Sequence, residues 1–576
     1  MMWIIAVDTI MPVFRMKPIV VMGESGRLSI EGKVGKDGTI EALKNLGITP
    51  ITRGSFITSD INLFGFKGKD INISVDGERF SNACPNRMDV PLIRINPLEV
   101  KKVIVYPTST LGSALGGEIR VIRRKPLEKP SLIGYLGLNT LSSTGGEVST
   151  AFEGYNQGLY LRFSRLNTYK DGEGRNFQQL YGYKDDVKFA HTFYEGGLTG
   201  SLRGLSYNVG VWYYKDVLFP YLMMDERESK TLSVGLSFNG NKLYANFTDH
   251  TMDNGLRNAM MYMLTNAKRY KLGIVGQNYD IYYDGWTAEN KMYTQMHMHM
   301  DTMKQMVMPN FSSYNALFGH QFNTGYINLY AKLGLQYFKT DVNKGRVFIP
   351  FALRPSYSIL SFEISSSAPD PKELYFSGHS FLGNPDLKQP IKFSLYLNPS
   401  YEFINLLLFS HIVKDYVEVV GKVSDGKKIT TFENTDALLV GFNMIIATNY
   451  IDITSNYTYG KNLRINDYLS EMPPLSVSIK LKTPEFLKSK GFIKFNYNGA
   501  QTKVSKSINE SPTTSWKTVD LGYEIGINNF SISLVLENIL NETYYTHLSY
   551  YRNPFMSGVR VYEPGRMLKI SIISGF

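Results

Sequence analysis

Cysteine is almost absent from this sequence, and long apolar runs are missing. The 576 residues include one Cys, at position 84, which excludes a fold held by intrachain disulfides. No stretch of about 18 apolar residues occurs, so membrane-spanning helices are not predicted. Trp is scarce, with 4 residues, but 39 Tyr and 33 Phe raise the aromatic content to 13%. A chain this rich in aromatic residues can bury a core, which excludes intrinsic disorder.

Signatures of the common enzyme classes are missing as well. The sequence has no His-Glu-x-x-His, no Gly-x-Ser-x-Gly and no Gly-Lys pair followed by Ser or Thr. We therefore expect no enzymatic activity. The net charge is +11, but the Lys and Arg residues are dispersed and form no nucleic-acid module, so we expect no nucleic-acid partner. This charge favours attraction to anionic lipid and lipopolysaccharide.

Alternation of apolar and polar residues dominates from about residue 130 to the end. Leu159, Leu161 and Phe163, for example, are separated by Tyr160 and Arg162. Transmembrane strands alternate in this way because one face meets lipid and the other the barrel interior. At about 20 residues for a strand with its turn, the region predicts a membrane β-barrel of about 22 antiparallel strands. A soluble sandwich or propeller also alternates, but the many Tyr and Phe near turns favour the aromatic girdles of a membrane barrel.

The N-terminal part has a different pattern, typical of a mixed α/β domain. A helix is expected over residues 39–46, which begin with an N-cap Thr and are followed by Gly47. Strands are expected at 70–77, 100–106 and 118–123. We therefore divide the chain into a poorly defined N-terminus (1–17), a compact domain (18–126) and the barrel (127–576). No Lys or Arg precedes Arg15, so an export signal is not readable here.

Six elements resemble motifs of TonB-dependent outer-membrane receptors, in the order of that family. They are the plug motifs at 65–68 (Gly-Phe-Lys-Gly), 75–79 (Val-Asp-Gly-Glu-Arg) and 97–107 with 115–119, and the barrel motifs at 382–388 (Leu-Gly-Asn-Pro-Asp-Leu-Lys), 537–541 with Tyr544 and Tyr545, and 563–566 with Phe576. Lys67 replaces the usual Arg, and Pro107 stands where the family has Gly-Pro. The resemblance implies a monomer in the outer membrane, with an N-terminal plug inside a 22-stranded barrel. It also implies a TonB box, placed near residues 18–22, that the TonB, ExbB and ExbD proteins pull.

Soft metal ligands occur together in a polar loop of the plug. Cys84 and Met88 stand four residues apart in the sequence Cys-Pro-Asn-Arg-Met-Asp. Thiolate and thioether sulfurs favour Cu(I). A lone Cys or Met can instead be a small buried apolar residue, but a free thiol is unusual in an oxidising compartment. Arg87 and Asp89 of the same loop are expected to form a structural pair.

A second pair of soft ligands lies in the barrel. His250 and Met252 follow the strand that begins near Lys242. The parity of this strand puts Leu243 and Phe247 on the outer face, and therefore His250 and Met252 on the inner face. The alternative is that His250 is a loop residue at the end of a strand.

Cys-x-x-x-Met and His-x-Met together resemble the copper-transporting branch of the TonB-dependent receptors. The resemblance implies one copper site formed by Cys84, Met88, His250 and Met252, which prefers Cu(I) and also accepts Cu(II). We therefore expect a receptor that imports copper ions into the periplasm. The alternatives are a receptor of the same fold for zinc or for a metal chelate such as a siderophore, and an outer-membrane barrel that does not transport.

Methionine is concentrated in one part of the barrel. Of the 23 Met residues, 11 lie between Met252 and Met308. The cluster includes the run Met296, His297, Met298, His299 and Met300. Interleaved His and Met favour a second, outer site of metal capture, while flexible apolar packing is the alternative.

Overall fold

A computed structural model describes residues 30–32, 38–52, 59–259, 261–293, 302–378, 381–424, 426–549 and 559–575. The N-terminus 1–17, the TonB box expected near 18–22, the Met/His run 296–300 and Phe576 lie outside these ranges.

The N-terminal region folds into two small sheets and one helix. A five-stranded sheet has the order β1-β7-β8-β5-β6, with β5 and β8 parallel, and a three-stranded sheet has the order β2-β3-β4. Helix α1 buries Ala42 and Leu43, and Gly47 follows it with a φ of +72°. This arrangement confirms the mixed α/β plug. The elements are β1 (Ile30–Gly32), α1 (Gly38–Asn45), β2 (Thr49–Thr52), β3 (Ser59–Leu63), β4 (Phe66–Lys67), η1 (Gly68–Asp70), β5 (Ile71–Val75), β6 (Glu78–Arg79), η2 (Pro91–Arg94), η3 (Pro97–Glu99), β7 (Val100–Tyr106) and β8 (Gly117–Arg123).

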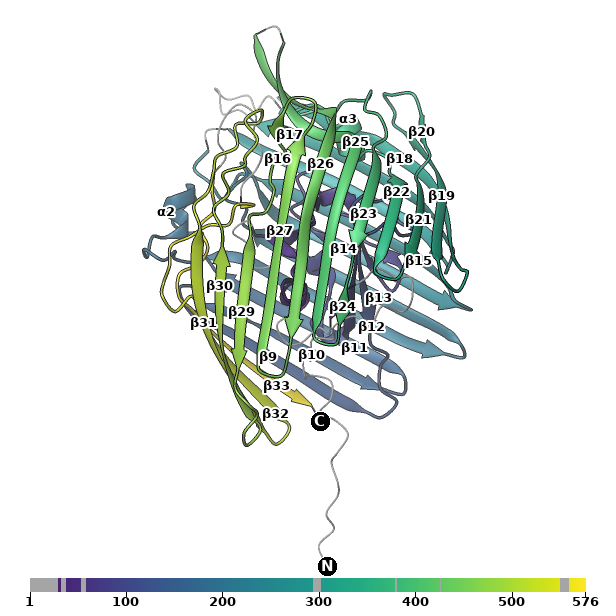
Figure 1. The fold of residues 1–576 in the computed structure, drawn as a ribbon. Helices are drawn as coiled ribbons and strands as arrows, with labels where there is room; N and C mark the ends of the chain where they lie inside the picture. The colour runs from purple at the N-terminus through teal and green to yellow at the C-terminus, as the bar shows by residue number, and fades with distance from the viewer. Residues whose placement is uncertain are drawn as a thin grey trace, which may run out of the picture.

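The remaining strands, β9 to β33, form one closed antiparallel barrel (Figure 1). It closes because β9 pairs with both β10 and β33. The short segments β20, β24 and β28 each pair with one neighbour, while β19, β23 and β27 pair directly with β21, β25 and β29. Within the described ranges, 22 strands therefore make up the wall, as the alternation predicts.

The first half of the wall consists of β9 (Ser131–Leu141), β10 (Gly145–Gly154), β11 (Gln157–Asn167), β12 (Phe189–Leu202), β13 (Leu205–Val217), β14 (Asp225–Phe238), β15 (Asn241–Asp253), β16 (Tyr262–Val275), β17 (Tyr279–Tyr293), β18 (Thr302–Asn323), β19 (Asn328–Lys339) and β20 (Arg346–Phe348). The second half consists of β21 (Phe351–Tyr357), β22 (Leu360–Ser366), β23 (Ile391–Leu397), β24 (Ser400–Tyr401), β25 (Ile404–Ser424), β26 (Lys427–Ala447), β27 (Ile451–Asn462), β28 (Asp467–Tyr468), β29 (Ser476–Lys482), β30 (Ser489–Asn498), β31 (Trp516–Ile527), β32 (Phe530–Glu537) and β33 (Met567–Gly575). Short helices α2 (Phe177–Tyr181) and α3 (Pro371–Tyr375) lie in the connections.

The outer face of the wall is apolar and aromatic, as the alternation requires. Four neighbouring strands, β16 to β19, place tyrosine rings side by side, with centroid distances of 5.7, 5.2 and 6.5 Å between successive rings. These rings are those of Tyr270, Tyr283, Tyr314 and Tyr337. Such a row matches the aromatic girdle of a membrane barrel. No helix in the described ranges has both the length and the apolar character needed to cross a membrane.

One exception to the alternation in the last strand has a packing reason. Ile573 occupies a position of β33 whose neighbours Lys569 and Ser571 share its face, so the sequence pattern predicts a polar residue there. Its side chain is buried in an apolar cluster with Tyr160 of the wall and Leu98 of the plug. The apolar side chain therefore faces inward because the plug supplies an apolar partner at that point.

The plug fills the barrel (Figure 1). Ion pairs join it to the wall at several points, beside the apolar contacts of the core. Arg79 forms a buried ion pair with Asp280 of β17. Glu78 lies 2.7 Å from Lys242 of β15, and the neighbouring sheet places Lys67 beside Glu471. On the opposite wall, Lys494 of β30 pairs with Glu41 of α1 at 3.1 Å. These pairs match several charges of the inner face with plug residues, whereas others, such as Lys392 and Glu363, pair within the wall.

We expect removal of one partner from the Arg79–Asp280 pair to destabilise the plug. Asp280→Ala leaves the Arg79 guanidinium buried with a lost partner, which costs about 3–5 kcal/mol. The midpoint of thermal unfolding in detergent should fall, and trypsin should cleave the plug faster. The exposed Glu228–Lys230 pair on β14 provides the control, and Lys230→Ala should leave both measurements unchanged. Equal stability of Asp280→Ala and wild type would contradict this account of the interface.

Candidate metal centre

One carboxylate holds the plug loop that carries Cys84. Asp89 accepts hydrogen bonds from the backbone N–H of Ala83 at 2.7 Å and of Cys84 at 2.8 Å. The same carboxylate forms an ion pair of 2.9 Å with Arg94, and both side chains are buried. Asp89 therefore fixes the backbone at Cys84 and brings Met88, its neighbour in sequence, back toward it.

Arg87 has a different partner from the one that the sequence suggests. Its backbone N–H donates to the carbonyl of Cys84 at 2.9 Å, and its φ of 56° closes the turn. Its guanidinium donates to Asp60 at 2.7 Å and to Asn82 at 2.8 Å. The expected Arg87–Asp89 pair is therefore wrong, because Arg94 reaches Asp89 from the next turn. Both residues are nevertheless structural parts of the loop.

Strand β15 carries the second pair of candidate ligands, His250 and Met252, and directs both into the barrel. Leu243 and Phe247 are each 42% exposed on the outer face. Tyr244 is 1% exposed, His250 is fully buried and Met252 is 3% exposed. The predicted parity is confirmed through the end of the strand, and the reading of His250 as a solvent-exposed loop residue is wrong.

The plug loop meets β15 at Cys84, Met252 and His250. The Sγ atom of Cys84 lies 3.8 Å from the Sδ atom of Met252. The His250 ring interacts with the Cys84 thiol, and Met88 is fully buried in the same apolar cluster as both sulfur residues. The Cys84 thiol, the Met252 thioether and the His250 imidazole thus meet between two separate parts of the fold. Among the described residues, no group of three or more His, Cys, Asp and Glu side chains could hold a metal ion.

His250 differs from the other buried histidines in its hydrogen bonding. His191 bonds Ser164, His411 bonds Ser394, and His547 bonds both Thr513 and Glu510. The His250 ring lies beside the Cys84 thiol and has its Nδ1 atom 3.4 Å from Glu226, but neither ring nitrogen makes a hydrogen bond to a described residue. A buried polar group without a partner is unfavourable, so an ion bound at His250 would satisfy it.

Two further residues, both on the wall, position the plug loop and have no sequence signal of their own. The indole N–H of Trp286, on β17, donates to the carbonyl of Ala83 at 2.7 Å. Arg269, on β16, donates to the carbonyl of Asn82 at 2.9 Å and lies over the Trp286 ring at 4.4 Å. These long-range contacts fix the position of the Cys84 loop relative to the wall.

A barrel connection also contacts the plug beside this loop. Lys372 of α3 donates to Asn86 at 3.3 Å, and Glu373 lies 3.3 Å from Lys69. Burial raises the pKa of Glu373 to about 7, although Lys69 opposes the rise. The connection that contains α3 therefore contacts the plug beside the Cys84 loop through two ionisable side chains, Lys372 and Glu373.

Methionines outside the four candidate ligands differ in their surroundings. Residues 296–300 lie outside the described ranges, and near them Met306 is 41% exposed while Met308 is fully buried in a second apolar cluster. Met261 is 42% exposed. Met224 escapes the sequence analysis, yet it packs against the cluster that contains Cys84. The register could have revealed it, because Met224 precedes β14 by one residue and β14 pairs with β15.

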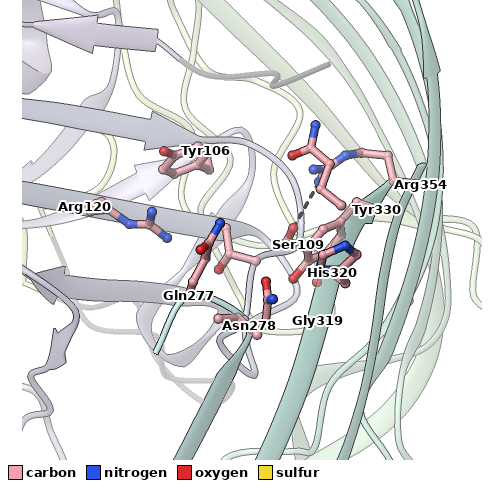
Figure 2. A pocket seen from close by; sticks show the side chains of 12 residues that line it. Tyr106, Ser109, Arg120, Gln277, Asn278, Gly319, His320, Tyr330 and Arg354 are labelled. Atoms are coloured by element: carbon pink, nitrogen blue, oxygen red, sulfur yellow. Dashed lines mark hydrogen bonds between the residues drawn. The ribbon is translucent and has the colours of Figure 1, made fainter. Parts of the chain in front are cut away.

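A cavity of about 150 Å³ lies elsewhere between plug and wall (Figure 2). It is lined by the turn between β16 and β17, at the end of the strands opposite to His250. Arg354 donates to the carbonyl of Ser109 across it at 3.0 Å. None of the four candidate ligands lines this cavity, so it is separate from the metal centre. Its lining includes Tyr106, Ser109, Arg120, Asn278, His320 and Arg354.

Comparison with known proteins gives similarity in structure alone. No protein-family model and no curated protein matches the sequence. A solved structure named copper transporter OprC superposes with a TM-score of 0.77 at 17% identity, covering 97% of this chain and 99% of that one. The siderophore receptor PirA from Acinetobacter baumannii gives 0.61 at 14% identity, covering 95% and 98%.

A third solved structure extends this similarity. The ferripyoverdine receptor of the outer membrane of Pseudomonas aeruginosa gives a TM-score of 0.65 at 14% identity, covering 96% of this chain and 86% of that one. All three matches extend over nearly the whole chain and include both the plug and the barrel. The chain therefore has the fold of the TonB-dependent outer-membrane receptors.

Proposed function

We propose that the chain is a TonB-dependent receptor of the outer membrane that imports copper ions into the periplasm. The observation that carries the proposal is His250, which is buried beside the Cys84 thiol with both ring nitrogens unbonded among the described residues. Together with Met88 and Met252 it supplies three sulfur atoms and one nitrogen. This donor set suits Cu(I), because soft thiolate and thioether ligands select it, and it accepts Cu(II) less readily.

The same donor set argues against zinc as the cargo. Zinc sites use Cys, His and carboxylate ligands, and thioethers are not among them. The similarity of the fold to siderophore receptors keeps a metal chelate as the second candidate cargo. The higher TM-score of the copper transporter supports copper. Exposed Met261 and Met306, with the run 296–300, would form the outer capture region.

Release follows from the division of the ligands between plug and wall. Cys84 and Met88 belong to the plug domain, which we assign to residues 18–126, and His250 and Met252 belong to the barrel. When TonB, energised by ExbB and ExbD, pulls the N-terminal box near 18–22, the plug loop moves away from β15. Each half then keeps two ligands, and the ion is bound more weakly. The receptor works as a monomer, with its net charge of +11 favouring contact with lipopolysaccharide.

Purified protein is expected to bind one Cu(I) per chain under anaerobic, reducing conditions. Cys84→Ser and Met252→Leu should each weaken binding at least about tenfold, or about 1.4 kcal/mol, because each removes one of four ligands. Competition with the Cu(I) chelator bathocuproine disulfonate measures the affinity. Met567→Leu is the matched control, since Met567 is also buried but lies in β33, outside the Cys84 cluster. The same copper content in wild type and both ligand variants would rule out the proposed site.

Transport is tested in Gram-negative cells that lack their own copper receptor. Cells that export this chain should grow under copper limitation and accumulate several-fold more copper, whereas the Cys84→Ser variant and a strain without TonB should not. Cells starved of iron and supplied with ferric siderophore should show no rescue. Rescue by siderophore alone would identify a chelate receptor. Failure of both supplies in cells with the barrel in the outer membrane would indicate a barrel that does not transport.

A further inference from the structure

A buried carboxylate adjoins the metal centre on the wall. Glu226 lies on β14 opposite Met252 of β15 and is 1% exposed. Its Oε1 atom is 3.4 Å from the Nδ1 atom of His250. Neither carboxylate oxygen makes a hydrogen bond within the described part of the chain. Within those same ranges, His250 is the one basic side chain at ion-pair distance from Glu226.

A β-bulge is the reason that this carboxylate faces inward. Ser229 and Thr231 of β14 are buried, whereas Lys230 and Leu232 are exposed. Strict alternation would therefore turn Glu226 outward together with Lys230. The register with β15 shifts between Glu226 and Glu228, where one extra residue, Arg227, is inserted. A bulge of this kind re-aims the side chains that precede it, and here it places Glu226 on the inner face.

Apart from His250, no basic side chain in the described ranges forms an ion pair with Glu226. The inserted Arg227 forms ion pairs with Asp216 at 3.0 Å and with Asp253 at 3.6 Å. The Tyr214 hydroxyl is buried in the same region and makes no hydrogen bond to a described residue. A buried carboxylate without a cation is unfavourable, so its position beside His250 requires a compensating interaction.

We propose that Glu226 is a positioning residue that orients His250 for copper, an inference that rests on the proposed function. A neutral imidazole carries one N–H and one lone pair, and it binds a metal ion through the lone pair. Metal-ligating histidines usually donate their other N–H to a carboxylate or carbonyl, which fixes the tautomer and the ring orientation. With an ion bound, Glu226 would accept the Nδ1–H of His250, which now lies 3.4 Å away, and the Nε2 lone pair would be left for the ion beside Cys84 and Met252. Nδ1 is the nitrogen that the structure places next to Glu226.

Three substitutions on the same strand test this role. Glu226→Ala removes the acceptor and should weaken Cu(I) binding by about 10–100-fold. Glu226→Gln keeps a carbonyl oxygen at the same place and should restore affinity to within a few-fold of wild type. Glu228→Ala removes the neighbouring carboxylate, which is 39% exposed, and should have no effect. The affinities are measured by competition with bathocuproine disulfonate.

X-ray absorption at the copper edge supplies a second measurement. Its imidazole signal would not depend on Glu226 if that residue had only a structural role. Wild type and Glu226→Gln should show the imidazole scattering of His250, and Glu226→Ala should show sulfur scattering with the imidazole contribution reduced. Labelling of the buried Cys84 thiol, slow in the folded protein, checks that each variant keeps its fold.

Two results would overturn this role for Glu226. They are an unchanged imidazole signal and affinity in Glu226→Ala, and a Glu226→Gln variant as defective as Glu226→Ala. Absence of copper from wild type in the same assay would instead overturn the proposed function.

Discussion

Each strand of a closed barrel directs every second side chain toward its centre, and the rest of this structure depends on that constraint. The inner face cannot be left empty, because it carries charged side chains such as the buried Lys242 and Asp280 and the partly buried Lys494. The plug supplies the opposite charges, at Glu78, Arg79 and Glu41. The plug sequence is therefore constrained by the wall as strongly as by its own small sheets.

The ion pairs between plug and wall are suited to a part that must move. Buried apolar surfaces lose free energy in proportion to the area that becomes wet, whereas charged groups that separate can be solvated by the water that enters. The apolar cluster around Cys84 also joins plug and wall, and Met88, Tyr214 and Met252 are each at most 3% exposed there. A movement of the plug loop would open this cluster and separate its two halves. In the proposed transport cycle, the bound ion itself joins plug and wall at that point.

The sequence predicts those features that depend on local patterns. The helix near 39–46, the strands at 100–106 and 118–123 and the inward direction of His250 follow from capping, turn and alternation signals. The partners of Arg87, the position of Trp286 and the approach of Met224 depend on contacts between distant segments, and no local pattern encodes them. Resemblance and spacing predict the four candidate ligands, and the structure brings Cys84 to 3.8 Å from Met252, 168 positions later in the sequence.

The bulge at Arg227 marks the limit of the alternation rule. One inserted residue reverses the faces of β14, so the rule that correctly places Met252 would place Glu226 in the lipid-facing row. A carboxylate in that row would be expensive, and in the interior it is still costly without a partner. Sequences usually keep such local violations where they serve a site. Here the violation sits beside His250. In the proposed arrangement, the imidazole N–H is directed to Glu226, which offsets the cost of burying the carboxylate, and the other ring nitrogen faces the ion.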